Sequence, residues 1–89
     1  MLTQQLQIIN KLGLHARAAA KLVKLSASFE SNIDIQKGEQ RVNSKSIMGV
    51  MMLAAGCGTE VTLYVEGVDE TDAMQALVTL INNRFDEDE

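Results

Sequence analysis

Hydrophobic positions in the first third of the chain switch from a period of two to a period of three to four. The period of two over residues 4–9, with one apolar residue before them, predicts a strand that buries one face. The longer period begins at residue 16 and predicts an amphipathic helix whose opposite face is polar and basic. The inward positions are Leu2, Leu6 and Ile8 in the strand, and Ala18, Leu22, Leu25 and Phe29 in the helix.

Alternating polarity returns further along the chain. Residues 32–37 and 40–43 flank a Lys-Gly-Glu turn, which predicts a hairpin of two strands. Residues 59–67 give the clearest alternation and predict a further strand. The inward positions of these strands are Ile33, Ile35, Val61, Leu63 and Val65.

Two more helices are predicted around that strand. Residues 44–55 predict a short helix with Ser44 or Ser46 as its N-cap, and the Gly-Cys-Gly that follows ends it. A last helix is expected to begin at Asp69 as its N-cap, and its acidic first turn suits the positive end of the helix dipole. The apolar stripe of this helix consists of Met74, Leu77, Val78, Ile81 and Phe85.

The predicted order of elements is therefore β-α-β-β-α-β-α. Amphipathic helices and half-apolar strands must bury one face against another, which predicts an α/β (α+β) fold of the two-layer open-faced sandwich type. The 89 residues suffice for a single domain. We expect the acidic tail at residues 86–89 to be mobile.

The composition narrows the functional classes. Aromatic residues are only Phe29, Tyr64 and Phe85, so the core is expected to be aliphatic. No apolar run approaches the ~20 residues of a membrane span and no signal peptide is recognisable, so no membrane association is expected. A single cysteine, Cys57, cannot form an internal disulfide, which suits a cytoplasmic protein, and we assign it no role.

Charge is divided unevenly along the chain. Residues 1–45 hold seven Lys and Arg but three acidic residues, whereas residues 46–85 hold one Arg and five acidic residues. The tail at residues 86–89 adds four more acidic residues, so the net charge of the whole chain is −4. The basic part is expected to attract an anion or an acidic protein surface, although a solvated face alone would also explain it. An RNA-binding domain is disfavoured because the chain is acidic and lacks stacking aromatics.

The only histidine, His15, stands where the first helix begins. Unpaired backbone N–H groups and the positive end of the helix dipole favour a neutral imidazole and form a cradle for an anion such as phosphate. Arg17 adds a guanidinium that can reach phosphate oxygens. A nucleophile, an anion cradle and a cation within three residues predict a phosphoryl-accepting site.

Two absences in the sequence favour carrying a phosphoryl group over hydrolysing it. The first carboxylate of the chain is Glu30, so no local base is expected beside His15 to activate water. One histidine and one cysteine offer no metal cluster, so neither a metal nor a cofactor is expected. A lone histidine near a turn is, however, more often a capping or surface residue, and the residues alone leave that alternative open.

The stretch "NKLGLHARAAAKLV" resembles the active-site signature of the HPr family, the histidine-containing phosphocarriers of the bacterial phosphoenolpyruvate:sugar phosphotransferase system. The stretch "RVNSKSIMGVMMLAAGCGTEV" resembles the second signature of that family, and the order of elements is the same. The resemblance covers nearly the whole chain. It implies a four-stranded antiparallel sheet of order 1-4-2-3 with three helices on one face.

The resemblance also implies a mechanism. His15 would accept a phosphoryl group on Nδ1 from phosphorylated Enzyme I and pass it to IIA proteins or domains, for sugar uptake or regulation. Arg17 and the backbone N–H groups of Ala16 and Arg17 would stabilise the phosphate. Such a carrier is a protein substrate that turns over between two enzymes, rather than a stand-alone enzyme, and we expect a monomer.

Two departures from the family pattern stand out. Ala18 occupies the position where most relatives have proline, so the helix is expected to start at the same place with slightly more fraying. The acidic tail looks more like the nitrogen-related branch, NPr. The alternative function is therefore a regulatory binding module of that branch, which docks on partners without relaying phosphate to sugars.

The short second helix carries more apolar residues than it can bury. We expect Val50 and Leu53 in the core, and Ile47, Met48 and Met51 on a docking face framed by Lys21 and Lys24. Such charges would speed the encounter with acidic partners.

Ser46 suits an N-cap, and it also resembles the serine that HPr kinase/phosphorylase modifies in some bacteria. A phosphate at that position would place negative charge in the docking face and repel acidic partners.

Overall fold

The computed structural model describes residues 1–88, which form a four-stranded sheet and three helices followed by a short 3-10 turn. The sequence predicted this order of elements correctly. The bounds are β1 (Leu2–Gln7), α1 (Ala16–Ala27), β2 (Asn32–Lys37), β3 (Gln40–Asn43), α2 (Ile47–Met52), β4 (Glu60–Glu66), α3 (Glu70–Asn82) and η1 (Arg84–Asp86).

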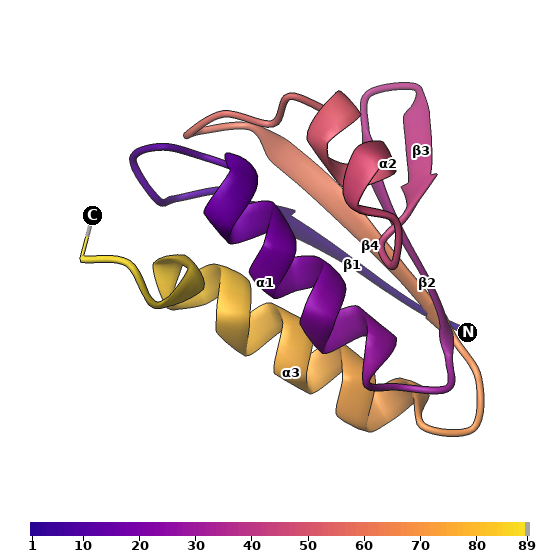
Figure 1. Cartoon of the computed structure of the whole chain (residues 1–89). Helices are drawn as coiled ribbons and strands as arrows, with labels where there is room; N and C mark the ends of the chain where they lie inside the picture. The colour runs from indigo at the N-terminus through magenta and orange to yellow at the C-terminus, as the bar shows by residue number, and fades with distance from the viewer. Residues whose placement is uncertain (89) are drawn as a thin grey trace.

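The sheet has the order β1-β4-β2-β3, and every pairing is antiparallel. The three helices cover one side of it, with α1 and α3 lying next to each other (Figure 1). The chain is thus an open-faced two-layer sandwich, as expected. Its other sheet face carries polar side chains, among them Tyr64, whose ring lies 3.8 Å from the Arg41 guanidinium.

The core lies between the sheet and the helices. The inward positions of β2 and β4 are almost fully buried, as their alternation predicted. Ile8 is fully buried just beyond the end of β1, where its N–H donates to the Thr59 carbonyl at 2.9 Å. The buried inward residues of β2 and β4 are Ile33, Ile35, Val61, Leu63 and Val65.

Helix α1 buries a different set of residues from the predicted stripe. Ala18 and Leu22 are inward, but Ser26 follows them into the core, while Leu25 and Phe29 are only partly buried. The Ser26 hydroxyl lies 2.7 Å from the hydroxyl of Ser44, so the two buried groups satisfy each other. Polarity alone could not predict this position because a buried hydroxyl depends on a partner distant in sequence.

Helix α2 starts at one of the two positions that the sequence allowed, and it is shorter than predicted. Because Ser44 is buried with Ser26, the N-cap is Ser46, whose Oγ accepts from the Gly49 N–H at 3.1 Å. The helix ends at Met52, and Lys37 Nζ donates to the Leu53 carbonyl just beyond it at 3.0 Å. A lysine at this end also complements the negative pole of the helix dipole.

Asp69 is the N-cap residue of α3, as expected, but its carboxylate makes no capping hydrogen bond to the helix. The carboxylate instead accepts from the Ser31 hydroxyl and from the backbone N–H groups of Glu30 and Ser31, the latter two at 2.9 Å. Two unpaired amides in the turn before β2 compete for the carboxylate more effectively than the helix end does. Asp69 therefore ties this turn to α3.

These hydrogen bonds make stability depend on pH. The Ser31 hydroxyl, followed by the Glu30 N–H, lowers the pKa of Asp69 from its ordinary value of 3.8. The folded state thus binds this proton less readily, so the contribution is present above 3.8 and is lost as the pH falls below it. Urea unfolding from pH 6 to pH 2 is expected to show that Asp69→Asn destabilises the chain at pH 6 and progressively less in acid.

The matched control for this experiment is Glu39→Gln, which removes a carboxylate from the exposed β2–β3 turn. For Glu39→Gln, the change in unfolding free energy relative to the unsubstituted chain should not decrease in acid as it does for Asp69→Asn. An Asp69→Asn difference that stayed constant over the whole pH range would contradict the assignment.

Candidate functional site

A tight turn between β1 and α1 places His15. Gly13 has a φ of +65°, and a Cβ at this position would lie 2.6 Å from the Ala55 carbonyl oxygen, so only glycine fits. The next residue, Leu14, is buried and donates its N–H to that same carbonyl at 2.8 Å. The histidine therefore follows a turn that is packed against the segment after α2.

His15 is the N-cap residue of α1, but its side chain makes no capping hydrogen bond. Its backbone carbonyl accepts from the Ala19 N–H at 2.8 Å and thereby starts the helix. The N–H groups of Ala16 and Arg17 belong to the first turn, which has no intrahelical acceptors. With its side chain 29% exposed, the imidazole stands beside these donors and remains accessible.

Arg17 and Ala18 occupy the first turn of α1 as expected. The Arg17 side chain is exposed and makes no hydrogen bond or ion pair within residues 1–88. Ala18 is fully buried, and α1 begins at Ala16 without a proline in its first turn. The predicted helix start is thus confirmed.

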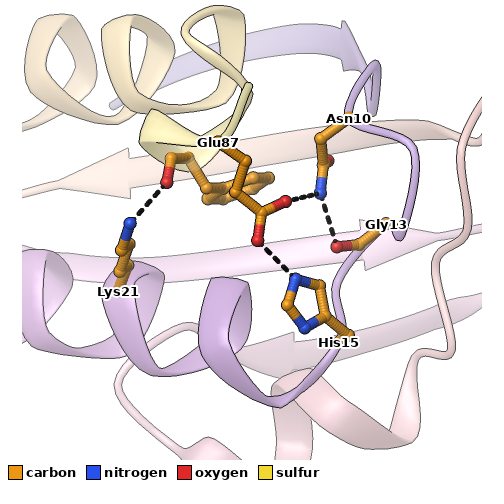
Figure 2. Close-up of polar contacts among 6 residues, drawn as sticks. Asn10, Gly13, His15, Lys21 and Glu87 are labelled. Carbon is orange, nitrogen blue, oxygen red and sulfur yellow. Dashed lines mark hydrogen bonds and ion pairs between the residues drawn. The ribbon is translucent and has the colours of Figure 1, made fainter. Parts of the chain in front are cut away.

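A carboxylate lies directly against the histidine ring, contrary to the expectation that no acid would be near it. Oε2 of Glu87 lies 2.6 Å from Nε2 of His15 (Figure 2). Its other oxygen, Oε1, accepts from Nδ2 of Asn10 at 2.9 Å. The expectation was wrong because it considered only carboxylates close in sequence, whereas the fold returns the end of the chain to the start of α1.

The segment that carries Glu87 is held by side chains on both sides. The Phe85 side chain is fully buried, and its carbonyl accepts from Lys21 Nζ at 2.7 Å. Glu87 itself is 14% exposed, and hydrogen bonds from Asn10 and then from His15 lower its pKa. Mobility was expected for residues 86–89. These contacts hold Glu87, and Glu89 lies outside the described residues.

Asn10 and Glu87 were not identified as site residues from the sequence. Asn10 is three residues before Gly13, and its Nδ2 donates to the Gly13 carbonyl at 2.8 Å, a side-chain contact typical of turns. The basic first half and the acidic tail were the only charge signal in the sequence that bears on this contact. Neither feature could place a particular carboxylate on a particular ring nitrogen.

The predicted cations lie on one side of α1. Lys21 contacts the tail, and Lys24 lines a shallow hollow with Leu80 and Asp86, on the side of α1 that faces α3. A second hollow beside His15 brings three cations, Lys11, Arg17 and Lys21, close to the carboxylates Asp86, Glu87 and Asp88. Basic and acidic parts of the chain therefore meet at the candidate site.

The exposed apolar residues of α2 form the other predicted feature. Ile47, Met48 and Met51 are 40%, 72% and 45% exposed, while Val50 and Leu53 are almost fully buried, as expected. Met52 is also exposed, at 67%, and was not singled out from the sequence. We call Ile47, Met48, Met51 and Met52 the α2 patch; its role in docking stays a prediction.

Ser46, at the start of α2, is exposed and serves as its N-cap. Capping explains its position, and its modification by a kinase stays a prediction.

Other kinds of site find no support within residues 1–88. Cys57 is an exposed free thiol. No group of three His, Cys, Asp or Glu side chains in these residues could hold a metal ion. The described helices are too short and too polar to cross a bilayer.

Comparisons with known proteins agree with the fold. The family model for the PTS HPr component phosphorylation site matches residues 2–83. The phosphocarrier protein HPr of Cupriavidus necator is 56% identical over 89 residues, which cover 100% of both chains.

Solved structures give the same result. The crystal structure of HPr-C-His from Thermoanaerobacter tengcongensis has a TM-score of 0.97 and 45% identity and covers 100% of both chains. A structure of an HPr dimer from the same bacterium has a TM-score of 0.79 and 46% identity, covering 98% of this chain and 100% of that one. With its fold, its signatures and its full-length relatives in agreement, the chain belongs to the HPr family of phosphocarrier proteins of the bacterial phosphotransferase system.

Proposed function

We propose that this chain relays phosphoryl groups through His15, from phosphorylated Enzyme I to IIA proteins or domains in the cytoplasm. The observation that carries the proposal is the placement of the ring. An accessible imidazole stands at the N-cap of α1, makes no capping bond, and is followed by first-turn amides and the exposed Arg17. A helix N-terminus of this kind favours an anion.

The transfer requires an unprotonated ring nitrogen. The Nδ1 lone pair of His15 attacks phosphorus, and the bond between phosphorus and the donor breaks with its electron pair remaining on the donor. The N–H groups of Ala16 and Arg17, together with the Arg17 guanidinium, stabilise the charge on the phosphoryl oxygens. Return of the group to an acceptor follows the same path in reverse.

A carrier must also keep water from attacking the phosphoryl group. Both oxygens of Glu87 are occupied, one by Asn10 and the other by His15. The nearby carboxylate is thus engaged as a hydrogen-bond acceptor rather than left available as a general base for water. This arrangement supports carrying over hydrolysis.

Donor and acceptor proteins dock in turn on the same surface in this proposal. The α2 patch offers exposed and conformationally adaptable methionines, which suit a surface that meets more than one partner. Arg17 adds positive charge at the start of α1 for acidic partners, whereas Lys24 lies on the side of α1 that faces α3. We propose that the relay operates with the chain as a monomer.

The test is incubation of the chain with phosphoenolpyruvate and Enzyme I. We expect one phosphoryl group per chain, labile in acid and stable in base, and located on His15 by mass spectrometry. Addition of a IIA protein should then remove it. A chain that binds these partners but takes up no label would contradict the relay and leave a docking module instead.

A further inference from the structure

The Glu87 carboxylate contacts one ring nitrogen of His15 and leaves the other open. Nε2 lies 2.6 Å from Oε2, whereas Nδ1 points away from Glu87 (Figure 2). An ionised carboxylate can only accept a hydrogen bond, so the ring nitrogen that meets it must carry the proton. In the neutral ring, the lone pair then lies on Nδ1.

The carboxylate is itself held by a buried amide. Nδ2 of Asn10 donates to Oε1 of Glu87 at 2.9 Å and to the Gly13 carbonyl at 2.8 Å, and Asn10 is fully buried. Its Oδ1 is buried without a hydrogen-bond partner among the described residues. Turning the amide over would place that oxygen against two acceptors, so the observed orientation is required.

The Asn10 amide links the turn before His15 to the Glu87 carboxylate. Both hydrogens of Asn10 Nδ2 are used in this orientation. One hydrogen holds the turn that precedes His15, and the other holds the carboxylate that meets its ring. Asn10 therefore couples the position of Glu87 to the position of the histidine.

The backbone before Glu87 is also unusual. Arg84, Phe85 and Asp86 have φ values of +56°, +53° and +63°, a left-handed conformation that side chains disfavour. The buried ring of Phe85 and the hydrogen bond from Lys21 Nζ to the Phe85 carbonyl hold this turn in place. This strained turn, held by the Phe85 ring and by Lys21, directs the chain so that Glu87 lies at the start of α1.

We propose that Glu87 is a positioning residue for phosphoryl transfer, because its carboxylate keeps the proton of His15 on Nε2 and presents Nδ1 as the nucleophile. This inference rests on the proposed relay through His15. It assigns to the acidic tail a part in the reaction that the sequence did not reveal.

The carboxylate also matches the change of charge during the step. When the Nδ1 lone pair forms the N–P bond, the Nε2 proton stays on the ring and the imidazole becomes positively charged. The Glu87 carboxylate faces that charge across the Nε2–H bond and stabilises it. When the phosphoryl group leaves for an acceptor, the N–P electron pair returns to Nδ1 and the ring is neutral again.

The experiment compares Glu87→Ala and Glu87→Gln with the matched control Glu39→Gln, which removes a carboxylate from the exposed β2–β3 turn. A glutamine oxygen can accept from either Asn10 or His15 but cannot replace both carboxylate oxygens. The tautomer of His15 is read from ¹⁵N chemical shifts. Transfer is measured in both directions by rapid quenching with Enzyme I and a IIA protein.

We expect the unsubstituted chain and Glu39→Gln to hold the neutral ring mainly in the Nε2–H form and to transfer at equal rates. Glu87→Ala should shift the ring toward a mixture of tautomers and slow transfer about tenfold in both directions, the lower end of the loss known for carboxylates that orient metal-bound histidines. Glu87→Gln should give a transfer rate and a tautomer ratio between those of the unsubstituted chain and Glu87→Ala. Urea unfolding checks that all variants are folded.

Other results would overturn the inference. Label on His15 of every variant at equal rates, with an unchanged tautomer, would exclude a positioning role while the relay itself stands. Faster transfer in Glu87→Gln would show that the carboxylate obstructs the site instead. No label on the unsubstituted chain would overturn the relay, and this inference with it.

Discussion

His15→Ala is expected to abolish phosphoryl transfer while the chain remains folded. No other histidine exists in the sequence to take over the nucleophile's role. The side chain is partly exposed, and its one hydrogen bond within residues 1–88 is to Glu87, so little buried surface is lost. The measurement is label from phosphoenolpyruvate and Enzyme I, together with the midpoint of urea unfolding.

Two results would contradict this prediction in different ways. Label retained by His15→Ala would place the phosphoryl group on another residue. A variant that fails to fold would show that the imidazole is structural. His15→Gln, which restores a hydrogen-bonding side chain at the N-cap without a nucleophilic ring, provides the second variant, and it should be folded and inactive.

Arg17→Ala is the second large effect that we expect, with the rate of transfer falling roughly a hundredfold, the usual cost of losing a donor to a developing oxyanion. The guanidinium is exposed and makes no hydrogen bond or ion pair in the described part of the chain, so nothing structural depends on it. Arg17→Lys should recover only part of the rate, because an ammonium keeps the charge but loses the two-pronged geometry. Single-turnover transfer from phosphorylated Enzyme I measures both variants.

The matched control is Arg41→Ala, which removes an arginine from β3. Arg41 pairs with Asp34 at 2.9 Å and lies over the Tyr64 ring on the open face of the sheet. Its removal should leave the transfer rate unchanged. Equal rates for Arg17→Ala and Arg41→Ala would identify Arg17 as an ordinary surface cation.

Much of the fold could be predicted from the sequence because it depends on local patterns. The alternation of Val61, Leu63 and Val65 determines both that β4 is a strand and which face is buried. The Gly13 turn and the change of period at Ala16 likewise place His15 at a helix start. Within α2, buried Val50 and exposed Met48 follow from the same periodicity.

The missed features all depend on pairs of residues far apart in the chain. Ser26 is buried because Ser44 meets it, and Asp69 turns away from α3 because the amides at Glu30 and Ser31 need an acceptor. Glu87 reaches His15 only through the left-handed turn at Phe85. The periodicity of a sequence does not encode such long-range contacts, because they form only when helices and strands pack together.

The close packing of Gly13 on Ala55 has a consequence for how relatives of this chain can diverge. Two stretches far apart in sequence share one backbone hydrogen bond, and a Cβ at position 13 would lie 2.6 Å from the Ala55 carbonyl oxygen, so a backbone shift in one stretch moves the other. A substitution in the segment that leaves α2 can therefore tilt the imidazole without touching it. Evolution of new partner contacts on α2 is thereby restricted to side chains that leave this junction undisturbed.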